Sequence, residues 1–355
     1  MNVLKKNKES EIQSILLKWY KKNKRDLPWR VLQVNKLPNP YYIFVSEYML
    51  QQTTVGTVKK RFEEFILKWP TIDSLASISD TLILSFWSGL GYYSRATNLL
   101  KAVKIIKKNF NSKIPNNYEE LLKLPGIGDY TAKAILGIAY NKPVMPLDAN
   151  IERILARIYG IKLPLIKIKK ELKEISNIFI SKNNATNLIQ SFMDYGSIIC
   201  TPRNPHCSNC LIKLKCSSYK KNLQNIIPLK NKPSSKKKKK YSRAYIFHNE
   251  KNEILLRKRS AKGMLASMLE VPNDNWEINK NKLVHDKIIN NIKYKIQSKG
   301  IIEYSFSHFD LETEVFFIVV KKSNFKNHKW VKIKNINKVG LPTVMKKIIS
   351  IAINQ

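Results

Sequence analysis

Apolar residues recur at steps of three and four through the first part of the chain, and this spacing predicts a mainly helical domain from residue 1 to about 222. The clearest stripe begins near Ser46 and predicts one continuous amphipathic helix. Its members are Phe44, Tyr48, Gln51, Val55, Val58, Phe62, Phe65 and Trp69. Further helices are expected at residues 83–87, 96–106, 130–140, 151–159 and 172–180.

The composition changes at residues 223–243, where proline, serine and a run of five lysines indicate a solvated basic linker. After the linker the apolar period shortens to that of strands. Strands are expected at residues 241–247, 253–259, 301–309 and 313–320, with helices near 283–296 and at the C-terminus. Since 355 residues exceed the usual size of one domain, we expect a second, α+β domain over residues 244–355.

Charge adds a candidate partner. Lysine and arginine number 64 against 26 aspartate and glutamate, a formal net charge of +38. Such an excess favours a polyanion, because Lys and Arg neutralise nucleic-acid phosphates. Lys, Asn and Ile are also what an AT-rich genome produces through its codons, so the charge supports DNA binding without proving it. The N-terminus has no signal-peptide core and no apolar stretch approaches membrane-spanning length, which predicts a cytoplasmic protein without a membrane partner.

The four cysteines of the chain lie in one segment, residues 200–216, which we call the cysteine loop. Their spacing is Cys200-x6-Cys207-x2-Cys210-x5-Cys216, and such clustering favours a metal site in a reducing compartment over disulfides. Coordination chemistry alone leaves zinc and a four-iron cluster open, because each accepts four thiolates. The spacing resembles the cluster loop of the endonuclease III family of DNA glycosylases. That resemblance implies one [4Fe-4S] cluster with a structural role.

A glycine-rich turn, LPGIGDYTA at residues 124–132, lies between two helical patterns. Gly126 and Gly128 allow a tight turn and leave backbone N–H groups open to a phosphate oxygen. Alone, such a turn is most often a plain helix connection. Here Asp148 follows in VMPLDANIERILAR, and the turn, the proline-containing loop and the aspartate together resemble the helix-hairpin-helix glycosylase signature.

Glu47 is the single charged residue in the apolar stretch YYIFVSEYML. An arbitrary helical glutamate would reach the surface, whereas a buried one keeps its proton because burial raises its pKa. Release of a base from DNA suits two carboxyls: a protonated one that protonates the leaving base, and an ionised one that stabilises the oxocarbenium sugar. We therefore predict that Glu47 and Asp148 are tuned in opposite directions.

Five segments carry a closer resemblance. SEYMLQQT, FWSGLGYYSRA, LPGIGDYTA, LDANIERILAR and the cysteine loop occur in the order and approximate spacing of the adenine DNA glycosylases, the MutY family. The resemblance covers nearly the whole chain. It implies a mainly α, helix-hairpin-helix glycosylase fold, followed by a Nudix-like α+β domain. It also implies an adenine-specific DNA glycosylase that flips its target out of the duplex, because the reacting atom is inaccessible in stacked DNA.

The resemblance assigns roles to individual residues. Glu47 is similar to the acid that protonates adenine and Asp148 to the oxocarbenium stabiliser, with Tyr130 and Asn150 supporting the site. Residues similar to the family's adenine pocket are Trp29, Leu50 and Gln190, and residues similar to its duplex wedge are Gln52 and Tyr92. Tyr130 stands where endonuclease III has a Schiff-base lysine that cuts the strand, so a monofunctional glycosylase is expected.

Phe306, Ser307 and His308 resemble the loop that recognises 8-oxoguanine in the family's Nudix-like domain. We therefore expect a monomeric, nucleoid-associated base-excision repair enzyme acting on duplex DNA with A:8-oxoguanine or A:G mismatches. Two alternatives stay open at this point. One is a related mismatch glycosylase acting on thymine or uracil, and the other is a DNA-binding iron–sulfur protein without catalysis.

Overall fold

The computed structural model describes residues 3–30, 37–229, 237–260, 263–286, 288–289, 295–321, 325 and 327–353. The chain divides into two compact units, residues 1–76 with 101–232 and residues 77–100 with 233–355. Residues 77–100 thus fall in the second unit, although their sequence pattern is that of the helical region. No helix among the described residues is long and apolar enough to cross a membrane.

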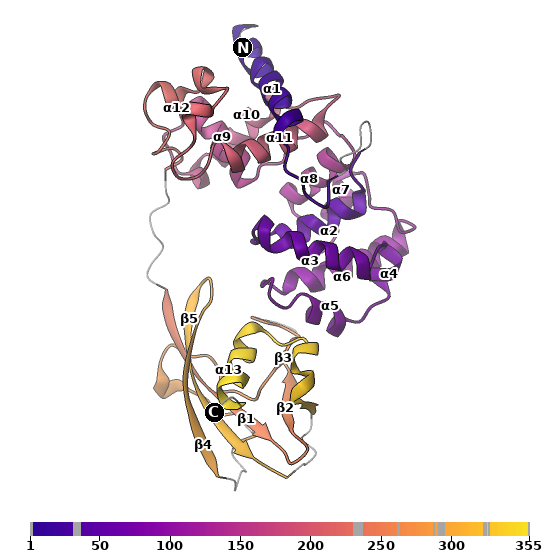
Figure 1. Ribbon diagram of the computed structural model, residues 1–355, viewed down its shortest axis with the longest axis vertical. Coiled ribbons are helices and arrows are strands. Elements are labelled where there is room, and N and C mark those ends of the chain that lie inside the picture. The colour runs from indigo at the N-terminus through magenta and orange to yellow at the C-terminus, as the bar shows by residue number, and fades with distance from the viewer. Residues whose placement is uncertain are drawn as a thin grey trace. The chain divides into compact units, whose positions relative to one another are not determined.

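The chain up to residue 222 is helical, as its apolar periodicity predicts (Figure 1). Its helices are α1 (Val3–Asn23), α2 (Pro40–Leu50), α3 (Val55–Lys68), α4 (Ile72–Ala76), α5 (Asp80–Phe86), α6 (Ser94–Asn109), α7 (Tyr118–Leu122), α8 (Asp129–Ala139), α9 (Ala149–Tyr159), α10 (Lys169–Ile178), α11 (Ala185–Ile198) and α12 (Ser217–Lys220). The helices expected at residues 83–87, 96–106, 130–140, 151–159 and 172–180 are present, with ends that differ by a few residues.

The apolar stripe that begins near Ser46 forms two helices, so the prediction of one continuous helix is wrong. α2 ends at Leu50 and α3 begins at Val55, and between them Gln52 adopts a left-handed backbone with φ of 57°. A left-handed residue cannot continue a right-handed helix. The spacing conceals the turn because α2 and α3 pack against each other and keep their apolar positions in phase.

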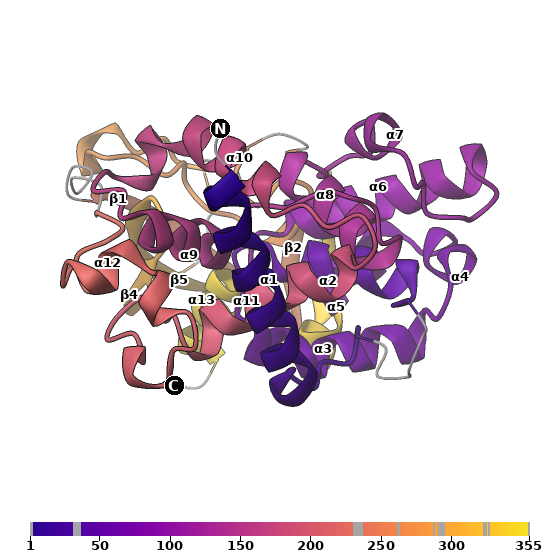
Figure 2. The ribbon, with the colours of Figure 1, turned by 90° about the horizontal axis from the view of Figure 1, so that it is seen from above.

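The first unit is built around α11, which is buried along most of its length. α1 lies against α11, and α11 also packs on α8 and α9 (Figure 2). The approach of α8 to α11 is close, because a Cβ on Gly137 would lie 2.2 Å from the Ile189 Cδ1 atom. α2 packs in turn on α8. The middle of α2, the start of α8 and the start of α9 are thereby held on a shared framework.

The second unit contains a mixed sheet with strand order β3-β2-β1-β5-β4, and β6 pairs with β2. The strands are β1 (Lys238–His248), β2 (Glu253–Lys258), β3 (Leu269–Glu270), β4 (Ile296–Ser305), β5 (Phe309–Val319) and β6 (His328–Lys332). β1 and β5 run parallel, whereas β4 and β5 form an antiparallel hairpin. The strands expected at residues 241–247, 253–259 and 313–320 are confirmed, whereas the one expected at 301–309 ends as β4 at Ser305 and is followed by a turn before β5. β1 takes up the end of the lysine run, and residues 230–236 lie outside the described residues.

Apolar side chains cover both faces of this sheet. Ala244 and Ile246 of β1 pack with Val344 and Ile348 of α13 (Thr343–Ile353), the helix expected at the C-terminus. In Figure 1, α13 lies across one face of the sheet. The alternate β1 residues Tyr245 and Phe247 pack on the other face, as the two-residue period of a strand requires.

The helix expected near residues 283–296 is not formed by the described part of that segment. Residues 283–286 are non-helical and β4 already begins at Ile296, while residues 287 and 290–294 lie outside the described residues. Side chains here take the backbone donors that a helix would use. The Val284 N–H donates to Asn275 Oδ1 at 2.7 Å, and the Asp286 N–H donates to Asp274 Oδ1 at 3.0 Å.

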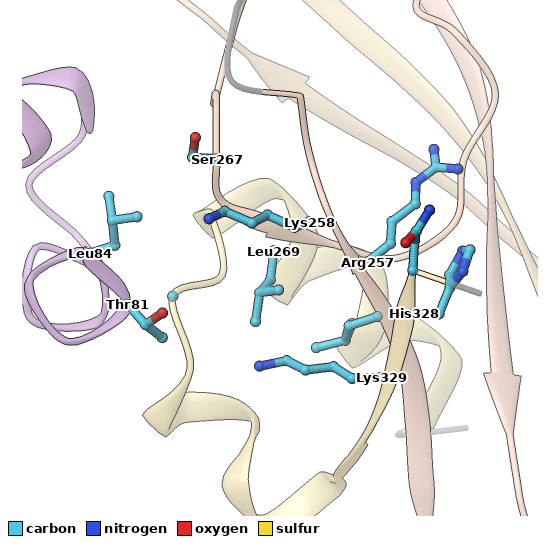
Figure 3. Close-up of a pocket in the computed structure, with 11 residues that line it drawn as sticks. Thr81, Leu84, Arg257, Lys258, Ser267, Leu269, His328 and Lys329 are labelled. Atoms are coloured by element: carbon cyan, nitrogen blue, oxygen red, sulfur yellow. The ribbon is translucent and has the colours of Figure 1, made fainter. Parts of the chain in front are cut away.

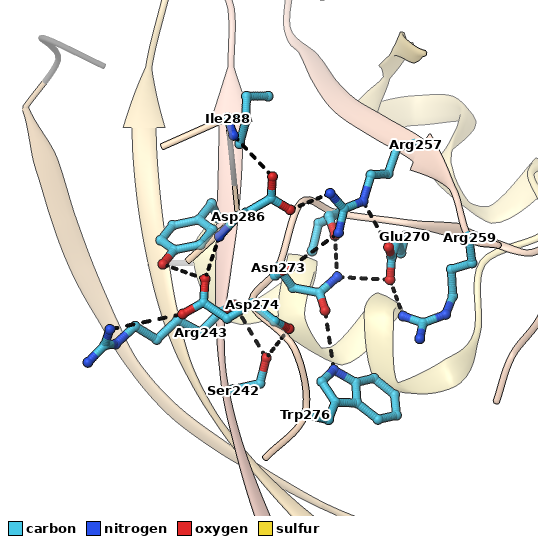
Figure 4. A network of polar contacts seen from close by, with 12 residues as sticks. Ser242, Arg243, Arg257, Arg259, Glu270, Asn273, Asp274, Trp276, Asp286 and Ile288 are labelled. Atoms are coloured by element: carbon cyan, nitrogen blue, oxygen red, sulfur yellow. Dashed lines mark hydrogen bonds and ion pairs between the residues drawn. The ribbon is translucent and has the colours of Figure 1, made fainter. Parts of the chain in front are cut away.

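A polar network ties this segment to the sheet (Figure 4). The Arg257 guanidinium donates to Glu270 at 2.9 Å and also pairs with Asp286. Asn273 donates to Glu270 at 2.8 Å. Because these carboxyls are buried, the pairing keeps their charges compensated. The network is therefore a structural support of the second unit.

Candidate active site

A cavity of about 560 Å³ in the first unit contains the residues that the sequence singles out for catalysis and base binding. Its wall is formed by the segment after α1, α2, the turn before α3, and the facing parts of α8, α9 and α11. The predicted residues that line it are Trp29, Glu47, Leu50, Gln52, Tyr130, Asp148, Asn150 and Gln190. Segments far apart in the sequence thus meet at one cavity.

Glu47 lies on the buried side of α2 with 6% of its surface exposed. Burial, together with the negative charge of Asp148, raises the pKa of Glu47 to about 8. A hydrogen bond from the Tyr130 hydroxyl and the positive charge of Arg30 act in the opposite direction. Glu47 therefore keeps its proton at neutral pH and can serve as a general acid.

Asp148 is the N-cap residue of α9. Its Oδ1 atom accepts from the Ile151 N–H at 2.7 Å, and its Oδ2 atom accepts from Asn150 Nδ2 at 2.9 Å. Burial raises the pKa of Asp148 as well, although these two donors oppose the rise. The predicted opposite tuning of the two carboxyls is therefore absent in the free protein. What distinguishes Asp148 is its donors, which favour its charged form.

Arg153 supports this arrangement from behind, and sequence reasoning missed it. Its Nη2 atom donates to Asn150 Oδ1 at 2.8 Å and to the Gly196 carbonyl at 2.7 Å. Its Nε and Nη1 atoms donate to the carbonyls of Cys200 and Ala149 at 2.8 and 3.0 Å. Position 196 also requires glycine, because α11 passes close to Asn150 there and a Cβ on Gly196 would lie 2.6 Å from the Asn150 Cβ atom. A sequence signal existed: Arg153 and Arg157 are two charged residues four positions apart among the apolar residues that α9 buries.

A second group of charges that sequence reasoning missed lies in the cavity wall, and we call it the Asp194 clamp. Asp194 of α11 is fully buried and accepts from Arg25 Nε at 2.6 Å and from the Arg25 N–H at 3.0 Å. Arg30 donates to the same carboxylate with two nitrogens, at 2.7 and 2.9 Å. Burial opposes the charged form of Asp194, but the two arginines hold its pKa below the usual value. Both arginines line the cavity.

The expected base pocket combines apolar walls with one polar group. Trp29 is buried against Phe62, with ring centroids 5.3 Å apart, and Leu50 is half-buried. Gln190 is 3% exposed, and its Nε2 atom donates to the Thr186 carbonyl at 3.1 Å. Its Oε1 atom has no hydrogen-bond partner among the described residues. A buried acceptor without a donor costs free energy unless a ligand supplies one.

The hairpin and the two wedge residues show three backbone outliers. Gly126 has φ of 83°, Gln52 has 57° and Tyr92 has 45°. Gly126 uses the freedom that glycine provides. Gly128 is the extended N-cap of α8 with φ of −106°, a conformation open to any residue, so the left-handed part of the turn is Gly126 alone of the two. Non-glycine residues in the left-handed region are uncommon, which makes Gln52 and Tyr92 candidates for function.

The three residues of the expected 8-oxoguanine loop differ in their surroundings. Phe306 packs against Tyr304, Phe309 and Trp276, with ring centroids 4.8, 4.9 and 5.4 Å away. Ser307 and His308 are exposed at the turn between β4 and β5. Within the second unit, the Tyr92 and Ser307 hydroxyl oxygens are 2.6 Å apart. Phe306 is therefore an anchor, and its two neighbours form the tip.

The four cysteines line one small cavity of about 20 Å³. Arg157 is buried and its Nη1 atom donates to the Cys200 sulfur at 3.3 Å, while the Tyr195 hydroxyl donates to the Cys210 sulfur at 3.4 Å. Cationic and hydroxyl donors aimed at sulfur suit thiolates. Among the described residues, no group of three or more His, Cys, Asp or Glu side chains is arranged to hold a metal ion.

A second cavity, of about 240 Å³, lies in the second unit (Figure 3). Leu256, Leu269 and Leu84 supply its apolar lining, and Lys258 and Lys329 its charge. None of the residues singled out by the sequence lines it. The chemistry expected from the sequence therefore belongs to the cavity around Glu47.

Comparison with known proteins agrees with this division. The family described as HhH-GPD superfamily base excision DNA repair protein matches residues 45–179, and the NUDIX domain family matches residues 243–350. A solved thermostable thymine-DNA glycosylase is similar to the helical part, with a TM-score of 0.54 and 27% identity over 61% of this chain and 98% of that one. The fold and its site thus define a helix-hairpin-helix protein of base-excision repair, joined to a Nudix-like domain.

Curated relatives identify the family within this class. The adenine DNA glycosylase of Buchnera aphidicola subsp. Schizaphis graminum is 37% identical, with 95% of this chain and 97% of the relative aligned. That of Buchnera aphidicola subsp. Baizongia pistaciae is 38% identical, with 94% and 95% aligned. The chain belongs to the adenine DNA glycosylase family.

Proposed function

We propose that this protein is a monofunctional DNA glycosylase that hydrolyses the bond between adenine and deoxyribose, when adenine lies opposite 8-oxoguanine or guanine in duplex DNA. The observation that carries the proposal is Glu47, a buried carboxyl with a pKa of about 8 that shares its cavity with Asp148. An adenine anion is a poor leaving group, so its departure requires a proton donor of this kind.

Glu47 is the proposed general acid. Its proton is transferred to a ring nitrogen of the extruded adenine, which weakens the N-glycosidic bond. The Tyr130 hydroxyl donates to the carboxylate that remains, and this hydrogen bond stabilises the product state of the transfer. Tyrosine has no amine, so it cannot form the Schiff base through which a lysine would cut the strand.

Asp148 is the proposed stabiliser of the oxocarbenium sugar. The negative charge of Asp148 raises the proton affinity of Glu47, and a proton held by Glu47 removes the like charge that would oppose ionisation of Asp148. The donors from Ile151 and Asn150 favour that distribution. Negative charge held beside the developing positive charge of the sugar lowers the barrier to bond cleavage.

Gln190 is the proposed reader of the base. Its unpaired Oε1 atom would accept from the exocyclic amine of adenine, between the apolar surfaces of Trp29 and Leu50. Thymine carries a carbonyl oxygen where adenine carries its exocyclic amine, so two acceptors would face each other there and the Gln190 acceptor would remain unsatisfied. This asymmetry favours adenine over the thymine or uracil of the alternative mismatch glycosylase.

Recognition of the opposite base is assigned to the tip of the β4–β5 turn, Ser307 and His308, on the anchor provided by Phe306. Gln52 and Tyr92 are the proposed wedge, which occupies the space of the extruded adenine. Gly126, in its left-handed conformation, and the exposed Gly128 would let the hairpin backbone approach a phosphate.

The cysteine loop is the proposed site of one [4Fe-4S] cluster. Cys200, Cys207, Cys210 and Cys216 would hold it, since their sulfurs line a single cavity and two of them already receive donors from Arg157 and Tyr195. When bound, the cluster supplies a covalent cross-link of the loop. Purified protein should absorb broadly at about 400 nm, whereas a zinc protein would be colourless there.

Base release under single-turnover conditions tests the function. Duplexes carrying A:8-oxoguanine, A:G, T:G and U:G are incubated with the wild type and with Glu47→Gln, and free bases are quantified. Adenine release by the wild type, its loss in Glu47→Gln, and strand cleavage only after alkali are expected. Release of thymine or uracil instead would establish the alternative enzyme. Absence of any release with retained DNA binding would leave a non-catalytic DNA-binding protein.

The recognition loop is tested separately. Ser307→Ala combined with His308→Ala should reduce the preference for A:8-oxoguanine over A:G, with adenine release from A:G largely retained. Phe306→Ala is the matched control for the anchor and should lower the stability of the second unit. An equal loss on both substrates in the double variant would show that the tip serves folding rather than recognition.

A further inference from the structure

The Asp194 clamp holds Arg25 and Arg30 in the wall of the cavity that also contains Glu47. Arg30 is one of the groups that act electrostatically on Glu47, and its charge works against protonation of that carboxyl. A positive charge near Glu47 is unfavourable if Glu47 has to stay protonated at neutral pH. Asp194, which forms ion pairs with both arginines, offsets part of this positive charge.

Asp194 takes up much of the hydrogen-bonding capacity of both guanidiniums. It is fully buried, receives both nitrogens of Arg30 in bidentate geometry, and receives the Nε atom and the backbone N–H of Arg25. The geometry fixes both side chains against the cavity wall. It also lowers the net charge of the clamp from two to one. In a buried setting a unit charge acts over distances that bulk water would screen.

Other titratable and charged groups face Glu47 and the Asp194 clamp. Facing Glu47 are Tyr130 of α8 and Asp148 at the start of α9, in addition to Arg30. Facing the clamp is Tyr20 of α1, whose ring centroid lies 6.0 Å from the Arg30 guanidinium carbon.

We propose that Asp194 is a positioning residue for base release: it fixes Arg25 and Arg30 in the cavity wall and neutralises part of the positive charge that Arg30 directs at Glu47. The proposal rests on the proposed role of Glu47 as general acid. Asp194 is not proposed to touch the base or the sugar. It acts through the arginines on the protonation of Glu47, so its effect is measured as the pH at which base release is lost.

The test is the pH profile of single-turnover adenine release from A:8-oxoguanine duplexes between about pH 6 and pH 10. Asp194→Asn keeps the shape of the side chain and removes its charge, so the decline at high pH should begin about 1 unit lower. Arg30→Gln removes the opposing charge, so the decline should begin about 1 unit higher. Asp73→Asn, at an exposed ion pair with Lys107 outside the cavity, is the matched control and should leave the profile in place.

Shifts in opposite directions support the proposal, because a structural defect would lower the rate at every pH without moving the decline. Unshifted profiles in both variants, or shifts in the same direction, would overturn it. If Asp194→Asn does not fold, as judged by circular dichroism, Arg30→Gln decides, and a profile without an upward shift overturns the proposal. A wild type that releases no adenine refutes the proposed function instead, so the two failures are distinguishable.

Discussion

Replacing Glu47 by glutamine should stabilise the protein while abolishing its proposed chemistry. Glutamine has nearly the same shape, and its amide can still bond to the Tyr130 hydroxyl. The difference lies in ionisation, because folding takes the pKa of Glu47 from the usual 4.5 to about 8. Between these values the unfolded chain has released its proton and the folded protein has not.

The sign and size of the effect follow from linkage. Because the folded state binds the proton more tightly, the contribution of Glu47 to stability is fully present below about pH 4.5 and is lost as pH rises toward 8. Each pH unit in this interval lowers the free energy of unfolding by about 1.4 kcal/mol. From pH 5 to pH 7.5 the wild type should therefore lose about 3 kcal/mol relative to Glu47→Gln. For a unit of this size, that loss corresponds to roughly 6–12 °C in melting temperature.

Thermal unfolding of both proteins across this pH range measures the difference directly. Glu64→Gln, at a partly exposed ion pair on α3, removes the same formal charge and is the control for net charge. The diagnostic quantity is the growth with pH of the stability difference between Glu47→Gln and the wild type, since any fixed effect of the amide cancels. A difference that stays constant from pH 5 to pH 7.5 would refute the burial of a protonated Glu47.

The remaining predictions concern activity and the cysteine loop. Adenine release by the wild type should be level below about pH 8 and fall tenfold per unit above it, because ionised Glu47 has no proton to give; a pH–rate profile measures this. Tyr130→Lys should gain strand cleavage, detected as a covalent protein–DNA adduct after borohydride reduction. Gly196→Ala should lower the release rate at least tenfold with DNA affinity retained, because its Cβ would displace Asn150. Arg157→Leu leaves buried carbonyls and the Cys200 sulfur without their donor. It should cost about 1–3 kcal/mol and lower the iron content per chain.

The apolar period predicts the helices of the first unit because each needs one buried face, and it predicts the strands of the second for the same reason. It fails where the backbone changes direction without changing phase, as at Gln52 between α2 and α3. It also fails at residues 283–286, where Asn275 and Asp274 capture backbone donors from a distance in sequence. The pattern of apolar residues along a segment does not indicate hydrogen bonds of this kind, which join its backbone to side chains elsewhere in the chain.

Most of the predicted residues that meet in the cavity were recognisable because they lie in motifs, which are SEYMLQQT for Glu47, Leu50 and Gln52, LPGIGDYTA for Tyr130, and LDANIERILAR for Asp148 and Asn150. Those that hold them in place were not. Asp194 bonds to Arg25 across 169 positions of the chain, and nothing near either residue indicates the other. Asp194 did carry the signal that identified Glu47, namely a lone charge in an apolar stretch, SFMDYGSII. Such a charge predicts a buried partner, but only the fold identifies it.

The three side chains in the turn between β4 and β5 have different surroundings. Phe306 is partly buried and packs against the core of its unit, whereas Ser307 and His308 are exposed to solvent. Folding therefore depends on the first residue, whereas the proposed recognition of the opposing base depends on the other two. In a lineage whose DNA changed in its load of oxidised bases, the tip could be altered without loss of the domain, while Phe306 would stay aromatic.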